Sequence, residues 1–113
     1  MISPHDFDIG RVAIQCELVN KEVRVAAEIT VSNAYKSEIA YEISLRGLQF
    51  IAHPCDESHT EFIIYKHDHV PTIVDLIENL ENVQLKHWCW GKLFGYSEGE
   101  IKRFLAETAS DTH

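Results

Sequence analysis

The first third of the chain alternates between hydrophobic and polar residues. Apolar residues occupy every second position from Val12 to Leu18, and the same alternation returns over residues 22–31. A period of two residues is typical of a strand that buries one face. Asn20 and Lys21 stand between the two runs, and asparagine tolerates the backbone conformation of a tight turn. The pattern predicts a β-hairpin of residues 11–19 and 22–31.

Three further runs extend the predicted sheet. Residues 38–46 alternate again, which favours a strand. A helix over residues 34–46 is the competing interpretation, because Glu, Ala, Lys and Leu are good helix formers. Apolar residues also dominate residues 48–52 and 61–65, which flank a polar loop. The sheet would then be a meander of about five strands, which is a usual size.

The apolar period lengthens after Lys66. Pro71 suits the first turn of a helix, and apolar residues at helical spacing follow it up to Leu80. We therefore expect a helix that begins near Pro71.

The segment from His87 to Leu105, which reads HWCWGKLFGYSEGEIKRFL, predicts a pair of helices. Gly95 can take the left-handed conformation that ends the first helix. Ser97 stands three residues before Glu100, the spacing of a capping box that begins the second helix. Strands followed by helices indicate an α+β fold. We expect one domain, residues 1–113, with an antiparallel five-stranded meander sheet (11–66) covered on one face by about three helices (71–107).

The charge and composition narrow the function classes. Eighteen acidic residues against ten basic ones give a net charge of -8, which disfavours nucleic-acid binding and suits a basic protein partner. No apolar run reaches the length of a membrane span, and the polar start does not resemble a signal peptide. Three cysteines, an odd number, do not form a disulfide framework. We expect a cytoplasmic protein.

Histidine and cysteine gather between residues 53 and 69. Imidazole and thiolate groups are the usual zinc ligands, and a cysteine beside a histidine base is the usual thiol nucleophile. The spacing matches no established zinc or cysteine-enzyme motif, and no nucleotide or cofactor motif is present. These residues are therefore weak metal or catalytic candidates, and no cofactor is expected. The candidates are His53, Cys55, His59, His67 and His69.

Aromatic residues of the helical hairpin suggest a contact surface. Trp88 and Trp90 are two positions apart, so they diverge by about 200° around a helix. We expect one of them, with Phe94 or Tyr96, to lie in a partner or homo-oligomer interface, where exposed aromatics are enriched. The alternative is that the hairpin buries both tryptophans. A second possible surface is the outward face of the sheet, where three small residues would leave room for a subunit or ligand. They are Ala13, Ala26 and Ala40.

The turn at residues 91–97, GKLFGYS, resembles turns of the form GxLLGYP in small phage and bacterial proteins. The likeness covers seven residues and implies no functional residue. Together these features predict a small, acidic, non-enzymatic binding module that occludes or sequesters a partner protein or small ligand. An inhibitor of a host system, encoded by a phage or mobile element, is one concrete form. The alternative is a small cysteine/histidine or zinc-dependent enzyme centred on residues 53–69.

Overall fold

The computed structural model describes residues 3–111, with side chains described up to residue 107. Within this range it has five helices and three strands, which confirms the α+β class and replaces the predicted five-stranded sheet. In chain order the elements are α1 (Pro4–Asn20), β1 (Ala26–Ser32), α2 (Lys36–Leu45), β2 (Gln49–Pro54), β3 (His59–Tyr65), α3 (Val70–Glu78), α4 (Val83–Leu93) and α5 (Glu98–Asp111).

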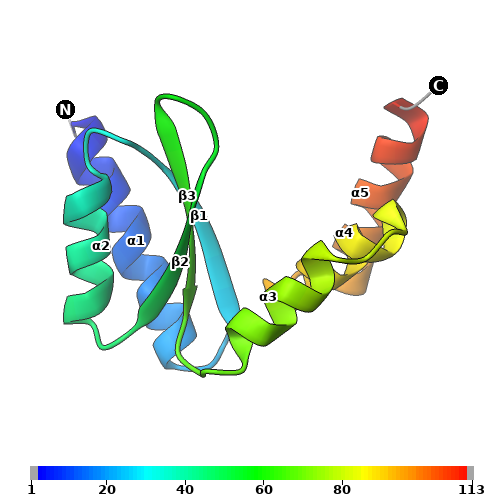
Figure 1. Ribbon diagram of the computed structural model, residues 1–113, viewed down its shortest axis with the longest axis horizontal. Coiled ribbons are helices and arrows are strands. Elements are labelled where there is room, and N and C mark those ends of the chain that lie inside the picture. Colours follow the sequence, from blue (N-terminus) through cyan, green and yellow to red (C-terminus); the bar gives the residue numbers. More distant parts are fainter. Residues whose placement is uncertain (1–2, 112–113) are drawn as a thin grey trace.

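The sheet is antiparallel, with the strand order β1-β3-β2. β3 is the central strand, and its Phe62 lies opposite Ile29 of β1 and Ala52 of β2. Figure 1 shows α1 and α2 on one side of the sheet and α3, α4 and α5 on the other. The prediction that helices cover a single face was therefore wrong, because residues 4–20 and 36–45, which the pattern predicted as strands in large part, form α1 and α2 and cover the other face.

The predicted hairpin at Asn20–Lys21 does not exist, because residues 4–20 form α1. The helix begins where the Ser3 hydroxyl accepts a hydrogen bond from the Asp6 amide at 3.1 Å, with a proline in the first turn. Val12, Cys16 and Val19 are its buried residues. Their spacing of four and three is helical. Ile14 between them is exposed and Ala13 and Leu18 are only half-buried, so the alternation imitates a strand pattern.

The strand predicted over residues 38–46 was also wrong, and the competing helix is correct. Residues 36–45 form α2, whose Ile39 and Ile43 are one helical turn apart and fully buried. Gly47 follows at φ +76°, a conformation that glycine adopts readily and that turns the chain into β2. The outward alanine face is lost with these strands, because Ala13 and Ala40 lie on helices and Ala26 is buried.

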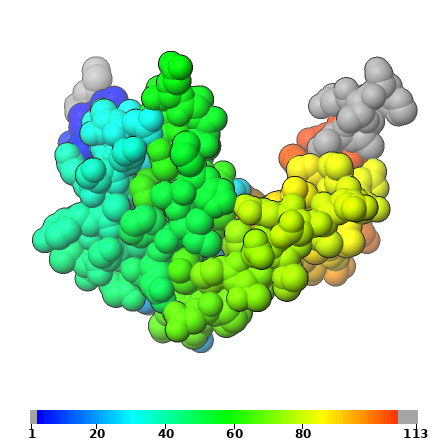
Figure 2. All heavy atoms as spheres, in the orientation of Figure 1, coloured from blue at the N-terminus to red at the C-terminus, as the bar shows by residue number. Residues whose placement is uncertain are grey.

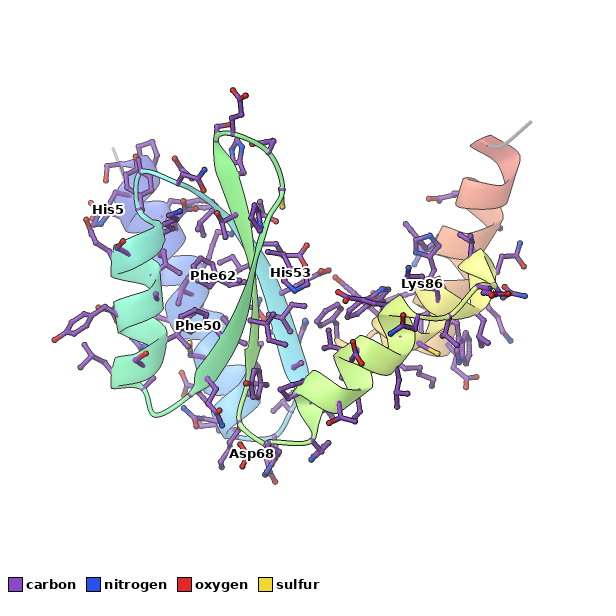
Figure 3. The ribbon with its side chains drawn as sticks, in the orientation of Figure 1. His5, Phe50, His53, Phe62, Asp68 and Lys86 are labelled. Atoms are coloured by element: carbon purple, nitrogen blue, oxygen red, sulfur yellow. The ribbon has the colours of Figure 1, made fainter. Side chains whose placement is uncertain are left out.

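Two cores lie on opposite faces of the sheet. The first fills the space between the sheet and helices α1 and α2, where Phe50 and Phe62 pack edge to face with centroids 5.2 Å apart (Figure 3). The second lies between the other face and helices α3 and α4. The first core consists of Val12, Cys16, Val19, Ala27, Ile29, Val31, Ile39, Ile43, Leu48, Phe62 and Ile64. The second consists of Ala26, Ile63, Tyr65, Val70, Val74, Ile77, Leu93 and Phe94.

The C-terminal helical hairpin forms as predicted. Gly95 has φ +82°, and the Tyr96 amide donates to the Gly91 carbonyl at 2.9 Å, which ends α4. The Ser97 hydroxyl accepts from the Glu100 amide at 3.2 Å, and the Ser97 amide donates to the Glu100 carboxylate at 3.0 Å. This capping box begins α5. The helix expected from Pro71 is α3.

Within residues 3–111, no helix has both the length and the apolar character needed to span a lipid bilayer.

Candidate functional site

A cleft of about 740 Å³ separates the sheet from the C-terminal helices. Figure 2 shows the hollow between the β2–β3 hairpin and helix α4. It exists because α3 and α4 cover only part of the second sheet face, while α5 packs on α4 and extends past the sheet. We name this space the hairpin cleft. It is lined by Glu28, Glu61, His87, Trp90, Gly91, Phe94, Tyr96, Glu100, Ile101, Arg103, Phe104 and Glu107.

The sheet wall of the hairpin cleft carries two carboxylates. Glu28 of β1 lies opposite Ile63, and Glu61 of β3 lies opposite Thr30, so the two glutamates are diagonal neighbours on one face. Diagonal neighbours of this kind are about 7–8 Å apart. Among the described residues, no ion pair or side-chain hydrogen bond of Glu28 or Glu61 is found. The sheet therefore presents two uncompensated negative charges to the cleft.

The helical wall is aromatic. Trp90 and Phe94 are one helical turn apart, and their rings stack with centroids 5.5 Å apart and planes inclined by 5°. Phe94 is buried, whereas Trp90 is half-buried and Tyr96 is exposed at the end of α4. Phe104 of α5 meets His87 of α4 edge to face at 5.3 Å.

Two contacts hold this aromatic wall in place. Arg24, just before β1, donates from Nη1 to the Phe94 carbonyl at 3.3 Å, so a cation caps the negative end of α4. Gly91 lets α5 approach closely, because a Cβ there would lie 2.6 Å from Cγ1 of the buried Ile101. The sheet side thus fixes the end of α4, and α4 in turn fixes α5.

Glu78 of α3 connects the sheet to the helices beside the cleft. Its carboxylate lies 3.7 Å from Nδ1 of His53 on β2, and its carbonyl accepts a hydrogen bond from Lys86 of α4 at 3.1 Å. Figure 3 shows His53 and Lys86 on facing elements. These contacts involve neither of the carboxylates on the sheet wall.

The electrostatics of the cleft are dominated by acid. Four glutamates line it, against the single guanidinium of Arg103 and the imidazole of His87. The pKa of Glu28 is raised above its usual value, first because the surrounding protein displaces part of its water, although the residue stays exposed, and second because Glu61 repels its charge. The pKa of Glu100 is lowered, chiefly by the hydrogen bonds of its cap with Ser97. A cationic ligand beside Glu28 would reduce the repulsion between its carboxylate and that of Glu61.

The aromatic residues predicted from the sequence divide between two sides of α4. Trp90, Phe94 and Tyr96 line the hairpin cleft, whereas Trp88 lies outside its lining. The Lys92 ammonium is instead 5.2 Å from the centroid of the Trp88 ring. Both tryptophans are half-buried: each packs partly against the protein and keeps part of its ring accessible to solvent.

The histidines and cysteine predicted between residues 53 and 69 are dispersed. His59 lies beside Asp56 at 3.3 Å, and His67 lies 2.6 Å from Glu22 and stacks on His69. Within the described residues no three His, Cys, Asp or Glu side chains are arranged to hold a metal ion.

The cysteines occupy different environments. Cys55 is exposed, and its thiol lies 4.0 Å from the His53 carbonyl. Cys16 is buried, and burial raises the pKa of its thiol to about 11, so it remains a neutral thiol at physiological pH. Cys89 packs against the second core.

Sequence reasoning missed Glu61 and the residues that α5 contributes to the cleft. One feature of the sequence does indicate these carboxylates. Glu28 and Glu61 each lie inside a strongly apolar run, AAEITV and TEFIIY respectively. A glutamate at such a position needs an aqueous opening beside the strand.

Comparison of the sequence with models of known protein families found no match, and comparison with curated proteins also found none. The geometry of the cleft is therefore the basis for its interpretation.

Because solvent reaches Glu28 and screens its charge, replacing this residue with glutamine should raise the thermal midpoint at pH 7 only slightly, by about 1 °C. The folded protein holds the Glu28 proton more strongly than the unfolded chain does, so ionisation above that pKa costs stability. The charged or titratable groups that share the cleft with Glu28 are Glu61, His87, Glu100, Arg103 and Glu107. The measurement is thermal unfolding of both proteins at several pH values.

The stabilisation should disappear near pH 3.5, where Glu28 is protonated in both folded and unfolded states. Glu57→Gln, in the turn between β2 and β3, is the matched control and should leave the midpoint unchanged at either pH. A lower midpoint for Glu28→Gln at pH 7 would show that the carboxylate stabilises the fold and contradict this interpretation.

Proposed function

We propose that this protein is a small, non-enzymatic binding module that sequesters a partner protein by enclosing a segment of it in the hairpin cleft. The observation that carries the proposal is the cleft itself, which has a half-buried aromatic wall facing a charged wall. Recognition sites commonly combine a mainly apolar lining with a few well-placed polar groups. Clefts of about 300–1,000 Å³ enclose a drug-sized molecule, so this one suits a few residues of a chain rather than a folded domain.

The aromatic wall supports protein recognition in particular. Tryptophan and tyrosine are enriched at the centres of protein interfaces, where they contribute much of the binding energy. Trp90 and Tyr96 retain accessible surface in the cleft, and Arg24 and Gly91 hold them in position without the ligand. A preorganised site loses less conformational entropy when a ligand binds.

The enzyme alternative has weaker support. It requires residues 53–69 to converge, and His53, His59 and His67 instead pair separately with Glu78, Asp56 and Glu22. Nucleophilic and metal chemistry both depend on several groups within contact distance of one another.

Selection of random peptides on the immobilised protein tests the proposal. Peptides enriched by the wild type should lose binding to the double variant Tyr96→Ala/Phe104→Ala, which removes two exposed aromatics of the cleft. The matched control is Tyr41→Ala/Leu45→Ala, which removes exposed apolar side chains from α2 on the opposite side of the sheet. Binding should be retained by this control.

Failure to enrich any peptide, or equal loss of binding in both double variants, would overturn the proposed function. Circular dichroism of each variant establishes that the fold persists. Gel filtration of the wild type and both variants shows whether the cleft is instead occupied by a second copy of the chain, which would also contradict the proposal.

A further inference from the structure

We propose that the segment enclosed by the hairpin cleft is basic, with two arginine side chains at alternate positions, one on Glu28 and one on Glu61. The inference rests on the proposed function and specifies its partner: an extended, arginine-rich segment of another protein.

The first argument is the uncompensated charge of the sheet wall. Glu28 and Glu61 are held on a rigid sheet, and neither forms an ion pair among the described residues. Arg103, the guanidinium among the lining residues, lies on α5, where Glu100 and Glu107 are its helical neighbours at i−3 and i+4. His53 lies opposite Glu61 in the pairing of β2 with β3, but its Nδ1 is 3.7 Å from the Glu78 carboxylate. A ligand cation would therefore meet two carboxylates that form no ion pair among the described residues.

The second argument is the aromatic wall that faces these carboxylates. A ligand that satisfies both walls needs a positive charge together with a flat, weakly hydrated surface. The arginine guanidinium has both, because it binds carboxylates through parallel hydrogen bonds and stacks on aromatic rings. Trp90 offers a partly accessible ring for such stacking, held by the parallel Phe94 ring behind it.

The third argument is spacing. Diagonal residues on neighbouring strands are about 7–8 Å apart. Alternate residues of an extended chain are about 6.8 Å apart and point to the same side. An extended Arg-X-Arg segment therefore presents its two side chains at the separation of Glu28 and Glu61. Adjacent arginines would point in opposite directions and reach only one of them.

The charge of the whole protein favours the same partner. A net charge of -8 attracts a basic segment over distance and repels phosphate-bearing ligands such as nucleic acids and anionic lipids.

Fluorescence anisotropy with three labelled peptides in the same Gly-Ser background tests the inference. The first contains Arg-Ser-Arg, the second contains citrulline in place of both arginines, and the third contains Arg-Arg-Ser. We expect the first to bind about tenfold more tightly than the citrulline peptide and about threefold more tightly than the third. Glu28→Gln/Glu61→Gln should weaken binding of the first peptide about tenfold.

Non-specific attraction is controlled by Glu57→Gln/Glu81→Gln, which removes the same charge from two exposed positions outside the cleft lining. This variant should change the affinity less than about twofold. Equal weakening by both double variants, or equal affinity for the arginine and citrulline peptides, would overturn the inference. Equal affinity for the first and third peptides would overturn the alternate pairing.

The two proposals can fail separately. If random selection enriches peptides that depend on Tyr96 and Phe104 but lack basic residues, the binding function holds and the basic partner is wrong. If it enriches none and Arg-Ser-Arg also fails to bind, both are wrong.

Discussion

Ile63→Ala and Ile64→Ala are each expected to lower the free energy of unfolding by about 3–4 kcal/mol. The two residues are neighbours on the central strand β3 and are almost completely buried, yet they point to opposite faces. Ile64 belongs to the core under α1 and α2, and Ile63 belongs to the core under α3 and α4. Both substitutions therefore leave a cavity. Denaturant titration followed by circular dichroism measures the effect.

Ile14→Ala is the matched control for this pair. Ile14 would point inward in the hairpin predicted from the alternating pattern, but on α1 it is 62% exposed. The substitution should cost less than about 0.5 kcal/mol. A loss near 3 kcal/mol for Ile14→Ala would contradict the exposed position on α1 and favour a strand at residues 11–19. A negligible loss for either β3 variant would contradict the burial of both faces of the sheet.

Gly91→Val is expected to destabilise the protein by about 2–3 kcal/mol and to abolish ligand binding in the hairpin cleft. The new side chain would overlap Ile101, because a Cβ alone would lie 2.6 Å from Cγ1 and 2.9 Å from Cδ1 of that residue. The Ile101 side chain must then change its packing, and we expect α5 to move away from α4 together with the wall that carries Ile101 and Phe104. Thermal unfolding and peptide anisotropy measure the two effects.

The control for Gly91→Val is the double variant Gly91→Val/Ile101→Ala. Shortening Ile101 relieves the overlap, so the double variant should be more stable than the sum of the two single effects predicts. A Cβ at Gly10, in α1, would meet no atom of the described residues within 4 Å, so Gly10→Val tests the effect of valine in a helix without a collision. Additive effects of the two substitutions would show that α4 and α5 do not meet at Gly91.

Local signals predicted the C-terminal half of the fold, because its capping interactions lie within a few residues. Gly95 and the pair of Ser97 and Glu100 act where the sequence places them. The N-terminal half was misread because Val12 and Cys16 fit both a period of two and a helical turn. The helix cap formed by Ser3 and Pro4, and the missing glycine at Asn20–Lys21, were the signals that favour α1 over a hairpin.

The cleft could be predicted only in part. Four aromatic residues were predicted to form a contact surface: Trp90, Phe94 and Tyr96 line the hairpin cleft, and Trp88 does not. Their role in binding stays a prediction. The opposite wall depends on contacts between distant parts of the chain: the pairing of β1 with β3, which brings Glu28 near Glu61, and the hydrogen bond from Arg24 to Phe94. The hydrophobic pattern of a single helix or strand does not predict which distant elements contact each other.

The two tryptophans provide the most direct test that the hairpin cleft is the binding site. Their indole N–H signals can be resolved by NMR and assigned with Trp88→Phe and Trp90→Phe. On titration with the Arg-Ser-Arg peptide, the Trp90 signal should shift progressively, because Trp90 lines the cleft. The Trp88 signal, from a ring outside that lining and beside Lys92, should stay in place. Movement of the Trp88 signal alone, or of neither signal while the peptide binds, would contradict the account.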